Sequence, residues 1–206
     1  MSEVAPLRAR QAELNRQVIL DSVVNLLEAN ETDGVSMQEI ARESGVSLRT
    51  LYRYFPTRRE LLAESGVHIR QRMGLIDEVG SADEVPASFW ANSARAAEHP
   101  GLARALLATS VGRLSREGTR SKRVAAIKSA MRELTTDLPE ARAHQVIGVI
   151  THLCSSSSWV AISDESGVSA LDARRGVVWA LETLIADLRN EAQHAPRSNS
   201  SPVIER

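Results

Sequence analysis

The side chains best suited to chemistry in this sequence are basic, and they lie close together. The set consists of Arg49, Arg53, Arg58 and Arg59. No acidic residue lies between Glu43 and Glu60, so this segment is locally positive. The whole chain of 206 residues carries 25 Lys and Arg against 26 Asp and Glu, a net charge of −1. Because the positive charge is local, the segment is suited to binding a polyanion at one place, and bulk charge attraction is excluded.

Other reactive side chains fit no catalytic or metal-binding pattern. The five histidines form no HxxxH or HExxH pair, and no GxSxG surrounds the serines at 155–158. We therefore predict no metal site, no cofactor and no enzymatic activity. Cys154 is the single cysteine, which excludes an intramolecular disulfide and is typical of a cytoplasmic protein. As a small apolar residue, it is expected in the core.

The elements that would position the arginines begin with a short helix. Ser36 and Glu39 have the spacing of a capping box, which predicts a helix over 37–44. Gly45 follows, and a residue without Cβ can adopt the positive φ that a tight turn requires. The arginines must therefore lie beyond a turn, on the next element.

That element is a second short helix. Ser47 can cap it, and Pro56 closes it, which predicts a helix over 48–55. Leu51 is expected to pack inward on Ala41 of the preceding helix. Two short helices joined by a glycine turn are a helix-turn-helix, which places its second helix in the major groove of DNA.

The remaining sequence also predicts helices, since apolar residues recur every three or four positions and no segment keeps a period of two. The expected fold is all-α with about nine helices, over 8–30, 37–44, 48–55, 57–77, 86–98, 101–115, 119–137, 140–163 and 170–192. Gly118 is among the expected breaks. The expected division is a DNA-binding domain at 1–56 with a loose tail at 1–7, a helical ligand-binding and dimerisation domain at 57–192, and a disordered tail at 193–206.

One stretch has the length of a membrane span. Residues 143–163 contain no Asp, Glu, Lys or Arg. They do contain two histidines, a glutamine, a threonine and five serines, which favour a buried core helix over membrane insertion. We therefore expect no membrane partner.

Residues 19–55, together with the following PTRRELL, resemble the TetR family of bacterial transcriptional regulators. VSLRTLYRYF and the TxxELL pattern after it are the most specific pieces, and the resemblance covers about residues 10–65. It implies a cytoplasmic homodimer that binds a palindromic DNA operator and responds to a small-molecule effector. A repressor is the leading interpretation. The alternatives are an activator or ligand-independent regulator and, from another class, a helical small-molecule carrier or enzyme.

The resemblance also implies which residues contact DNA. They are Ser36, Met37, Ser47, Leu48, Arg49, Thr50, Tyr52, Arg53, Tyr54 and Arg58. The helix beginning at Ser36 and Met37, the two tyrosines and Arg58 stand at phosphate-contacting positions. Arg49 replaces a residue that is often small in the family, and an arginine there can read guanine through two hydrogen bonds.

Two further sets are expected in the second domain. Bulky residues among many small ones predict an apolar effector pocket between helices, lined by Met73, Trp90, Met131, Thr151, His152 and Trp159. An apolar stripe on the last helix predicts a four-helix dimer interface, formed by Val177, Leu181, Leu184 and Leu188.

Overall fold

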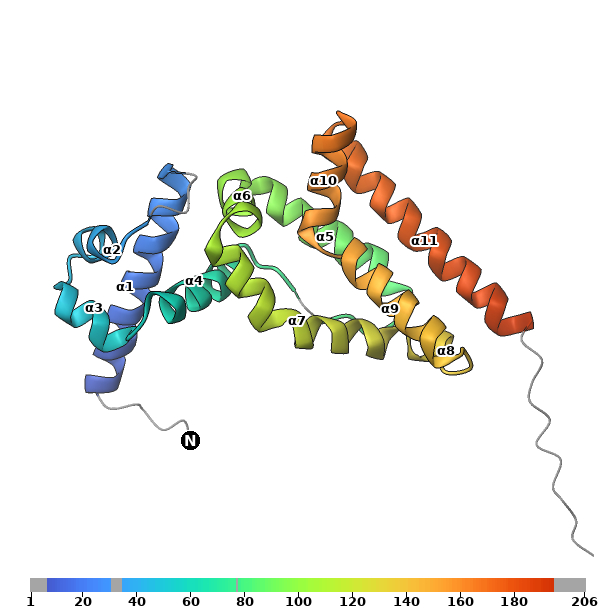
Figure 1. Ribbon diagram of the computed structural model, residues 1–206, viewed down its shortest axis with the longest axis horizontal. Coiled ribbons are helices and arrows are strands. Elements are labelled where there is room, and N and C mark those ends of the chain that lie inside the picture. Colours follow the sequence, from blue (N-terminus) through green and yellow to red (C-terminus); the bar gives the residue numbers. More distant parts are fainter. Residues whose placement is uncertain (1–6, 31–34, 77, 195–206) are drawn as a thin grey trace, which may run out of the picture. The chain divides into compact units, whose positions relative to one another are not determined.

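The computed structural model describes residues 7–30, 35–76 and 78–194, and every element within those ranges is a helix (Figure 1). The elements are α1 (Leu7–Asn30), α2 (Met37–Glu43), α3 (Leu48–Tyr54), α4 (Arg58–Arg72), α5 (Glu84–Glu98), α6 (Pro100–Ala108), α7 (Ser110–Ala130), α8 (Arg132–Thr135), α9 (Glu140–Leu153), α10 (Ser156–Ser166) and α11 (Ala170–His194). The all-α prediction is confirmed, with eleven described helices instead of nine. Most of both predicted tails lies outside the described residues, although Leu7 begins α1 and residues 193–194 end α11.

The chain divides into two compact units. The first contains residues 1–77 and 90–123, and the second contains residues 78–89 and 124–206. Both α5 and α7 contribute residues to each unit. The helix-turn-helix therefore shares its unit with α4 and α6. The predicted division of functions between two domains stays a prediction.

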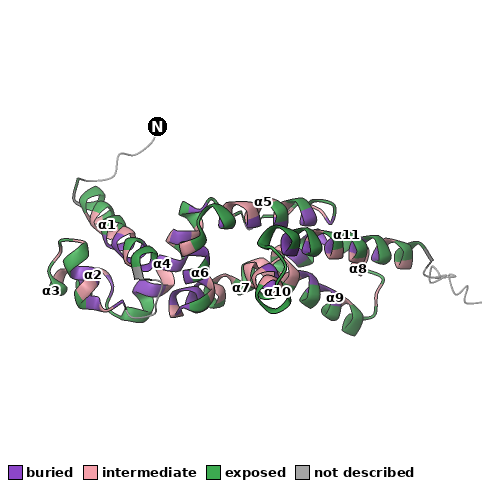
Figure 2. Ribbon diagram, turned by 90° about the horizontal axis from the view of Figure 1, so that it is seen from above, coloured by how far each residue is buried: buried purple, intermediate pink, exposed green. Residues whose placement is uncertain are grey.

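The core of the first unit is built around α1, which packs against α2, α4 and α6, while α2 packs against α3. Ile19, Val23 and Leu27 repeat along one face of α1 and are buried. Their spacing of four residues keeps them on one side of the helix. Helix α3 has one buried residue, Leu51, and most of its other residues are exposed, as the burial colours of the ribbon in Figure 2 also show. The fold thus holds α3 by a single apolar anchor and leaves its outer side accessible.

The predicted break at Gly118 is wrong, because α7 continues through it. The chain breaks earlier, at Thr109, whose backbone is extended and whose Oγ1 donates a hydrogen bond to Ala105 O at 2.6 Å. Arg116 donates to the carbonyl oxygens of Leu106 and Leu107, so the end of α6 is satisfied by a side chain from α7. An exposed glycine inside a helix costs only about 1 kcal/mol, which the rest of α7 offsets.

The predicted single helix over 140–163 is also divided. Ser155 has an extended backbone, and its Oγ donates to His152 O at 2.6 Å. Ser158 Oγ donates to Leu153 O at 2.7 Å, so serine side chains take carbonyls that a continuous helix would use. No single helix in the described ranges is long and apolar enough to cross a membrane. Only α9 and α10 taken together reach that length and apolarity, and they are bent by 70°.

Helix α11 organises the second unit. It packs mainly against α10 and also against α8 and α9. Val177, Leu181, Ile185 and Leu188 are the largest buried apolar residues of α11. They recur at intervals of three and four, so one face of α11 is used within the protomer.

Candidate nucleic-acid interface

The start of α2 is fixed by the predicted capping box. Glu39 N donates to Ser36 Oγ at 3.2 Å, and Ser36 N donates to Glu39 Oε2 at 2.8 Å. Met37 is buried, so it can reach a ligand only through its backbone. The helix N-terminus carries partial positive charge, which suits a phosphate.

This capping box makes folding stability depend on pH. The hydrogen bonds that the Ser36 backbone and hydroxyl donate hold the pKa of Glu39 below its ordinary value. A carboxyl with a lowered folded-state pKa contributes stability above its unfolded pKa of about 4.3, and loses it as the pH falls through the folded pKa. We expect Glu39→Gln to destabilise the protein at about pH 7, with a difference from wild type that shrinks towards about pH 3. Urea unfolding followed by circular dichroism measures both values.

The matched control for that prediction is Glu60→Gln in α4. Glu60 occupies the same position behind its cap, since Glu60 N donates to Thr57 Oγ1 at 3.2 Å. Among the described residues its carboxylate accepts no hydrogen bond from Thr57 in return. Equal losses for the two variants at every pH would refute the role assigned to the Glu39 carboxylate.

The turn and the cap of α3 follow the sequence prediction. Gly45 has φ +68°, the left-handed conformation. Thr50 N donates to Ser47 Oγ at 3.1 Å, and the two hydroxyl oxygens lie 2.9 Å apart. Both Ser47 and Thr50 are thus engaged in the cap, with Ser47 exposed and Thr50 half-buried.

The outer side of α3 presents Leu48, Arg49, Tyr52 and Arg53 together. The four residues lie within two turns of one helix and are exposed, with Tyr52 at 45%. Two guanidinium groups and a phenol on one accessible face can donate to phosphate oxygens and to base edges. This face is the candidate DNA-reading surface.

Tyr54 differs from Tyr52, because it is engaged within the chain. Asn15 Nδ2 of α1 donates to the Tyr54 hydroxyl at 3.1 Å, and this bond lowers the pKa of Tyr54. The Arg53 guanidinium lies 5.2 Å from the Tyr54 ring centre. Tyr54 therefore ties α3 to α1, and its contact with phosphate stays a prediction.

Arg58 and the start of α2 come together although they are far apart in sequence. The Arg58 guanidinium donates to Val35 O at 3.3 and 3.4 Å. Val35 directly precedes Ser36, so Arg58 lies beside the N-terminus of α2. The structure thus brings together Arg58, Ser36 and Met37. These three predicted DNA contacts lie outside the recognition helix and its N-cap.

Sequence reasoning missed the ion pairs that hold α1 to α4. Arg16 lies 4.5 Å from the centre of the Phe55 ring, donates to Tyr54 O and pairs with Glu64. Further along, Asp21 lies 2.8 Å from His68 Nε2 and also contacts Arg72. Both connections join α1 and α4, so a displacement of α4 would also shift α1, which packs against the helix-turn-helix. No local sequence pattern identifies such long-range pairs.

The structure divides the predicted effector-pocket residues. Met73 and Trp90 belong to the first unit. The four in the second unit are Met131, Thr151, His152 and Trp159. Thr151 Oγ1 and Trp159 Nε1 are buried and have no hydrogen-bond partner among the described residues. The two cavities given below are lined by other residues, so this six-residue pocket stays a prediction.

The predicted dimer stripe faces the protomer itself. Val177, Leu181 and Leu188 are buried within the chain, with Leu181 at 0% exposure. Leu184 and Leu188 line a small cavity of about 80 Å³ between α9 and α11. Val177, Leu181 and Leu188 therefore contribute to the core of the second unit, whereas Leu184 is half-buried, and the predicted dimer interface stays a prediction. The apolar residues that α9 and α11 do expose include Val149, Leu171 and Trp179.

Comparison with known proteins agrees with this geometry. Residues 19–65 match the model of the bacterial regulatory proteins of the tetR family. An HTH-type transcriptional regulator of Mycobacterium tuberculosis is 32% identical over 158 residues, which cover 71% of this chain and 78% of that protein. An HTH-type regulator of Haemophilus influenzae is 35% identical over 75 residues, or 34% of this chain and 37% of that protein.

Solved structures show the same fold over most of the chain. A TetR regulator from Rhodococcus sp. RHA1 covers 85% of this chain and 98% of its own, with a TM-score of 0.57 and 20% identity. A TetR variant from Acinetobacter baumannii in complex with minocycline covers 84% and 94%, with a TM-score of 0.53 and 16% identity. The family consists of DNA-binding regulators, not enzymes. The matched helix-turn-helix and the relative from M. tuberculosis together establish that the chain belongs to the TetR family of bacterial transcriptional regulators.

Proposed function

We propose that this protein is a homodimeric, ligand-responsive repressor that binds a palindromic operator in the bacterial cytoplasm. The observation that carries the proposal is the exposed face of α3, where Arg49, Tyr52 and Arg53 stand on a helix held by Leu51. Arg58 lies beside the N-terminus of α2, and we assign phosphate contacts to both. Arg49 reads a base edge, and the other groups fix the register.

Exposed apolar residues on α9 and α11 support dimerisation. Trp179 is 68% exposed and Val149 is 50% exposed, on two helices that pack against each other. Large apolar side chains that the protomer leaves exposed on these helices can be covered by a second subunit. A two-fold dimer places two recognition helices about 34 Å apart, in successive major grooves, which is why the operator is a palindrome.

Release by an effector is supported by the connection of α4 to the reading head. Helix α4 begins at Arg58, shortly after the recognition helix, and the ion pairs Arg16–Glu64 and Asp21–Arg72 join it to α1. A ligand that binds one position of α4 better than another shifts the population towards or away from DNA. The similar Acinetobacter structure is a complex with minocycline, which supports a small molecule as the effector here.

Base reading by Arg49 is testable. A palindrome is first selected from random duplex DNA by the purified protein. We expect Arg49→Ala to lose at least about tenfold affinity for that palindrome, at roughly 1–3 kcal/mol for each half-site, because one base pair in each half-site is no longer read. Affinity for scrambled DNA should stay unchanged. Fluorescence anisotropy at fixed salt measures both, since phosphate contacts make affinity salt-dependent.

Tyr52→Phe is the matched control on the same face, since it removes only a hydroxyl. It should weaken both duplexes alike, because phosphate contacts carry no sequence information. Equal losses on both duplexes for Arg49→Ala would refute base reading, and failure to select any palindrome would refute the operator. Transcription in vitro from a promoter containing the palindrome then distinguishes a repressor from an activator. A search for small molecules that release the operator tests the alternative of a ligand-independent regulator.

A further inference from the structure

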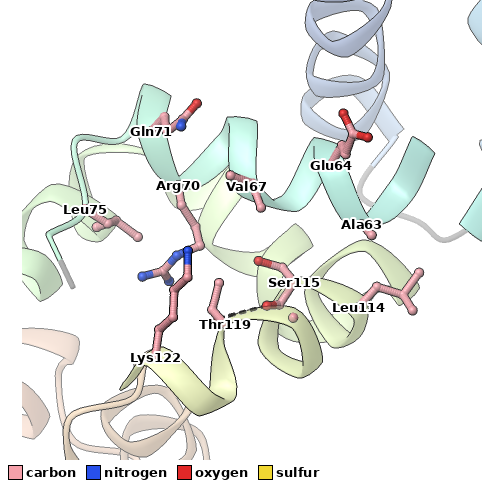
Figure 3. Close-up of a pocket in the computed structure, with 11 residues that line it drawn as sticks. Ala63, Glu64, Val67, Arg70, Gln71, Leu75, Leu114, Ser115, Thr119 and Lys122 are labelled. Carbon is pink, nitrogen blue, oxygen red and sulfur yellow. Dashed lines mark hydrogen bonds between the residues drawn. The ribbon is translucent and has the colours of Figure 1, made fainter. Parts of the chain in front are cut away.

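A cavity of about 390 Å³ lies between α4 and α7 in the first unit (Figure 3). Its volume falls within the range that holds small molecules. The two helices approach closely at one point, because a Cβ on Gly66 would lie 2.4 Å from Ser115 Cβ. Gly66 is one turn from Arg70, and Ser115 is one turn from Thr119. The cavity therefore opens beside a fixed crossing of α4, the helix that follows the recognition helix.

One part of the cavity wall is apolar. Val67 and Leu75 come from α4 and the segment after it, and Leu114 comes from α7. Val67 points into the space between the helices in Figure 3 and is 43% exposed. Covering such a side chain with hydrocarbon removes apolar surface from water and favours binding. The body of a ligand here should be apolar.

The other part of the wall is positive. Arg70 from α4 and Lys122 from α7 extend towards each other, and their nitrogen atoms meet on the same side of the cavity (Figure 3). Glu64, the one acidic residue of the wall, points away and pairs with Arg16. Arg70 has another polar contact in the chain, whereas Lys122 makes no hydrogen bond or ion pair with the described residues. An anion beside Lys122 would gain a charge-assisted hydrogen bond, and the Arg70 guanidinium on the same side of the cavity adds to the positive charge there.

We propose that this cavity binds an amphipathic anion. Its single carboxylate or phosphate head lies between Lys122 and Arg70, and its short hydrocarbon or aromatic body lies along Val67, Leu75 and Leu114. The inference rests on the proposed function, since it makes this molecule the effector that repositions α4. It names a charged head where sequence reasoning expects a largely apolar molecule.

The test uses isothermal titration calorimetry on the full chain without DNA. Decanoate and decyl phosphate are the anionic probes, and decanol and decylamine carry the same hydrocarbon with a neutral or cationic head. We expect the anions to bind at least about tenfold more tightly than decanol, because a charge-assisted hydrogen bond is gained. Decylamine should bind more weakly than decanol, because its head is repelled. Comparison of decanoate with decyl phosphate identifies the preferred head group.

Two variants place the binding in the cavity. Lys122→Met should weaken decanoate about tenfold and leave decanol unchanged. Lys128→Met is the matched control, because Lys128 is the only other lysine, lies on the same helix and does not line the cavity. Val67→Trp fills the space from a partly exposed position, so it should abolish binding of both probes while circular dichroism shows an intact fold.

The outcomes separate this inference from the proposed function. If decanoate and decyl phosphate bind no more tightly than decanol, or if Lys122→Met and Lys128→Met behave alike, the anion site is refuted. Operator binding and its release by another molecule would still stand in that case. If decanoate binds and Lys122→Met weakens it, the site is supported. Unchanged operator affinity with decanoate bound would then refute only the proposed response to this ligand.

Discussion

Replacing Gly112 by alanine should destabilise the protein by at least about 3 kcal/mol. A Cβ at this position would lie 1.8 Å from Leu106 O and 2.6 Å from Leu106 Cα, which are backbone atoms of the preceding helix. A side chain could rotate away from such a clash, but the α6 backbone is held by Arg116 on the carbonyls of Leu106 and Leu107. Relief requires α6 and α7 to separate. Urea unfolding monitored by circular dichroism gives the free energy.

Gly118→Ala is the matched control for Gly112→Ala. Gly118 lies on the same helix, and a Cβ there would meet nothing within 4 Å. Alanine at a helical position with open space stabilises a protein by about 0.4–1 kcal/mol, because it restricts the unfolded chain. The two substitutions should therefore have opposite signs. A loss of unfolding free energy below about 0.5 kcal/mol for Gly112→Ala would show that α6 and α7 can separate at little cost, and it would contradict the prediction.

Leu181→Glu should unfold the second unit at a cost of about 3–5 kcal/mol. Leu181 is fully buried against the helices of its own protomer, so a carboxylate there would be desolvated without a partner. We expect the variant to lose helical circular dichroism and its cooperative thermal transition. Operator binding should be lost with it, because a dimer cannot form from unfolded units.

Trp179→Glu, two residues earlier on the same helix, should behave differently. Trp179 is mostly exposed, so glutamate there keeps the fold and places charge on the surface that we assign to the dimer. Light scattering should report a folded monomer with weakened operator binding. A Leu181→Glu variant that is folded and monomeric would support the predicted dimer interface that contains Leu181. A dimeric Trp179→Glu would put the interface on another surface.

The helix-turn-helix could be predicted from sequence because its determinants are local. Each determinant involves residues at most four positions apart: the capping box of Ser36 and Glu39, the turn at Gly45 and the cap at Ser47. The structure has both caps as predicted. The DNA-facing side follows from one buried residue, Leu51, since the rest of so short a helix has little to cover it.

Helix boundaries elsewhere depend on contacts that sequence does not display. Arg116 donates hydrogen bonds to the last carbonyl oxygens of α6 and lies seven residues after the break at Thr109. The helix propensity of Thr109 does not predict this break. The helix predicted over 140–163 passes through the serines at 155–158, although serine hydroxyls compete for carbonyls and can bend a helix. Gly118 suggested a stop, but an exposed glycine alone is too weak a signal.

The dimer stripe illustrates a different limit. The spacing of Val177, Leu181 and Leu188 predicts correctly that one face of α11 is buried. Periodicity reports burial, and it does not say whether the covering helices come from the same chain or from a partner. The same applies to Arg16 and Arg58, whose partners lie far away in the sequence and are found only in the folded protein.

The turn between α2 and α3 has a consequence for chirality. A Cβ on Gly45 would meet nothing within 4 Å, yet φ is +68°. The position therefore excludes L-alanine by backbone handedness and not by volume, since this region is strained only for L residues. D-Alanine, whose preferred backbone angles are the mirror image, fits there without strain and would restrict the unfolded chain. The turn of the DNA-reading motif thus selects against one mirror form of a side chain by backbone conformation, whereas Gly112 excludes the Cβ of an L residue by lack of space.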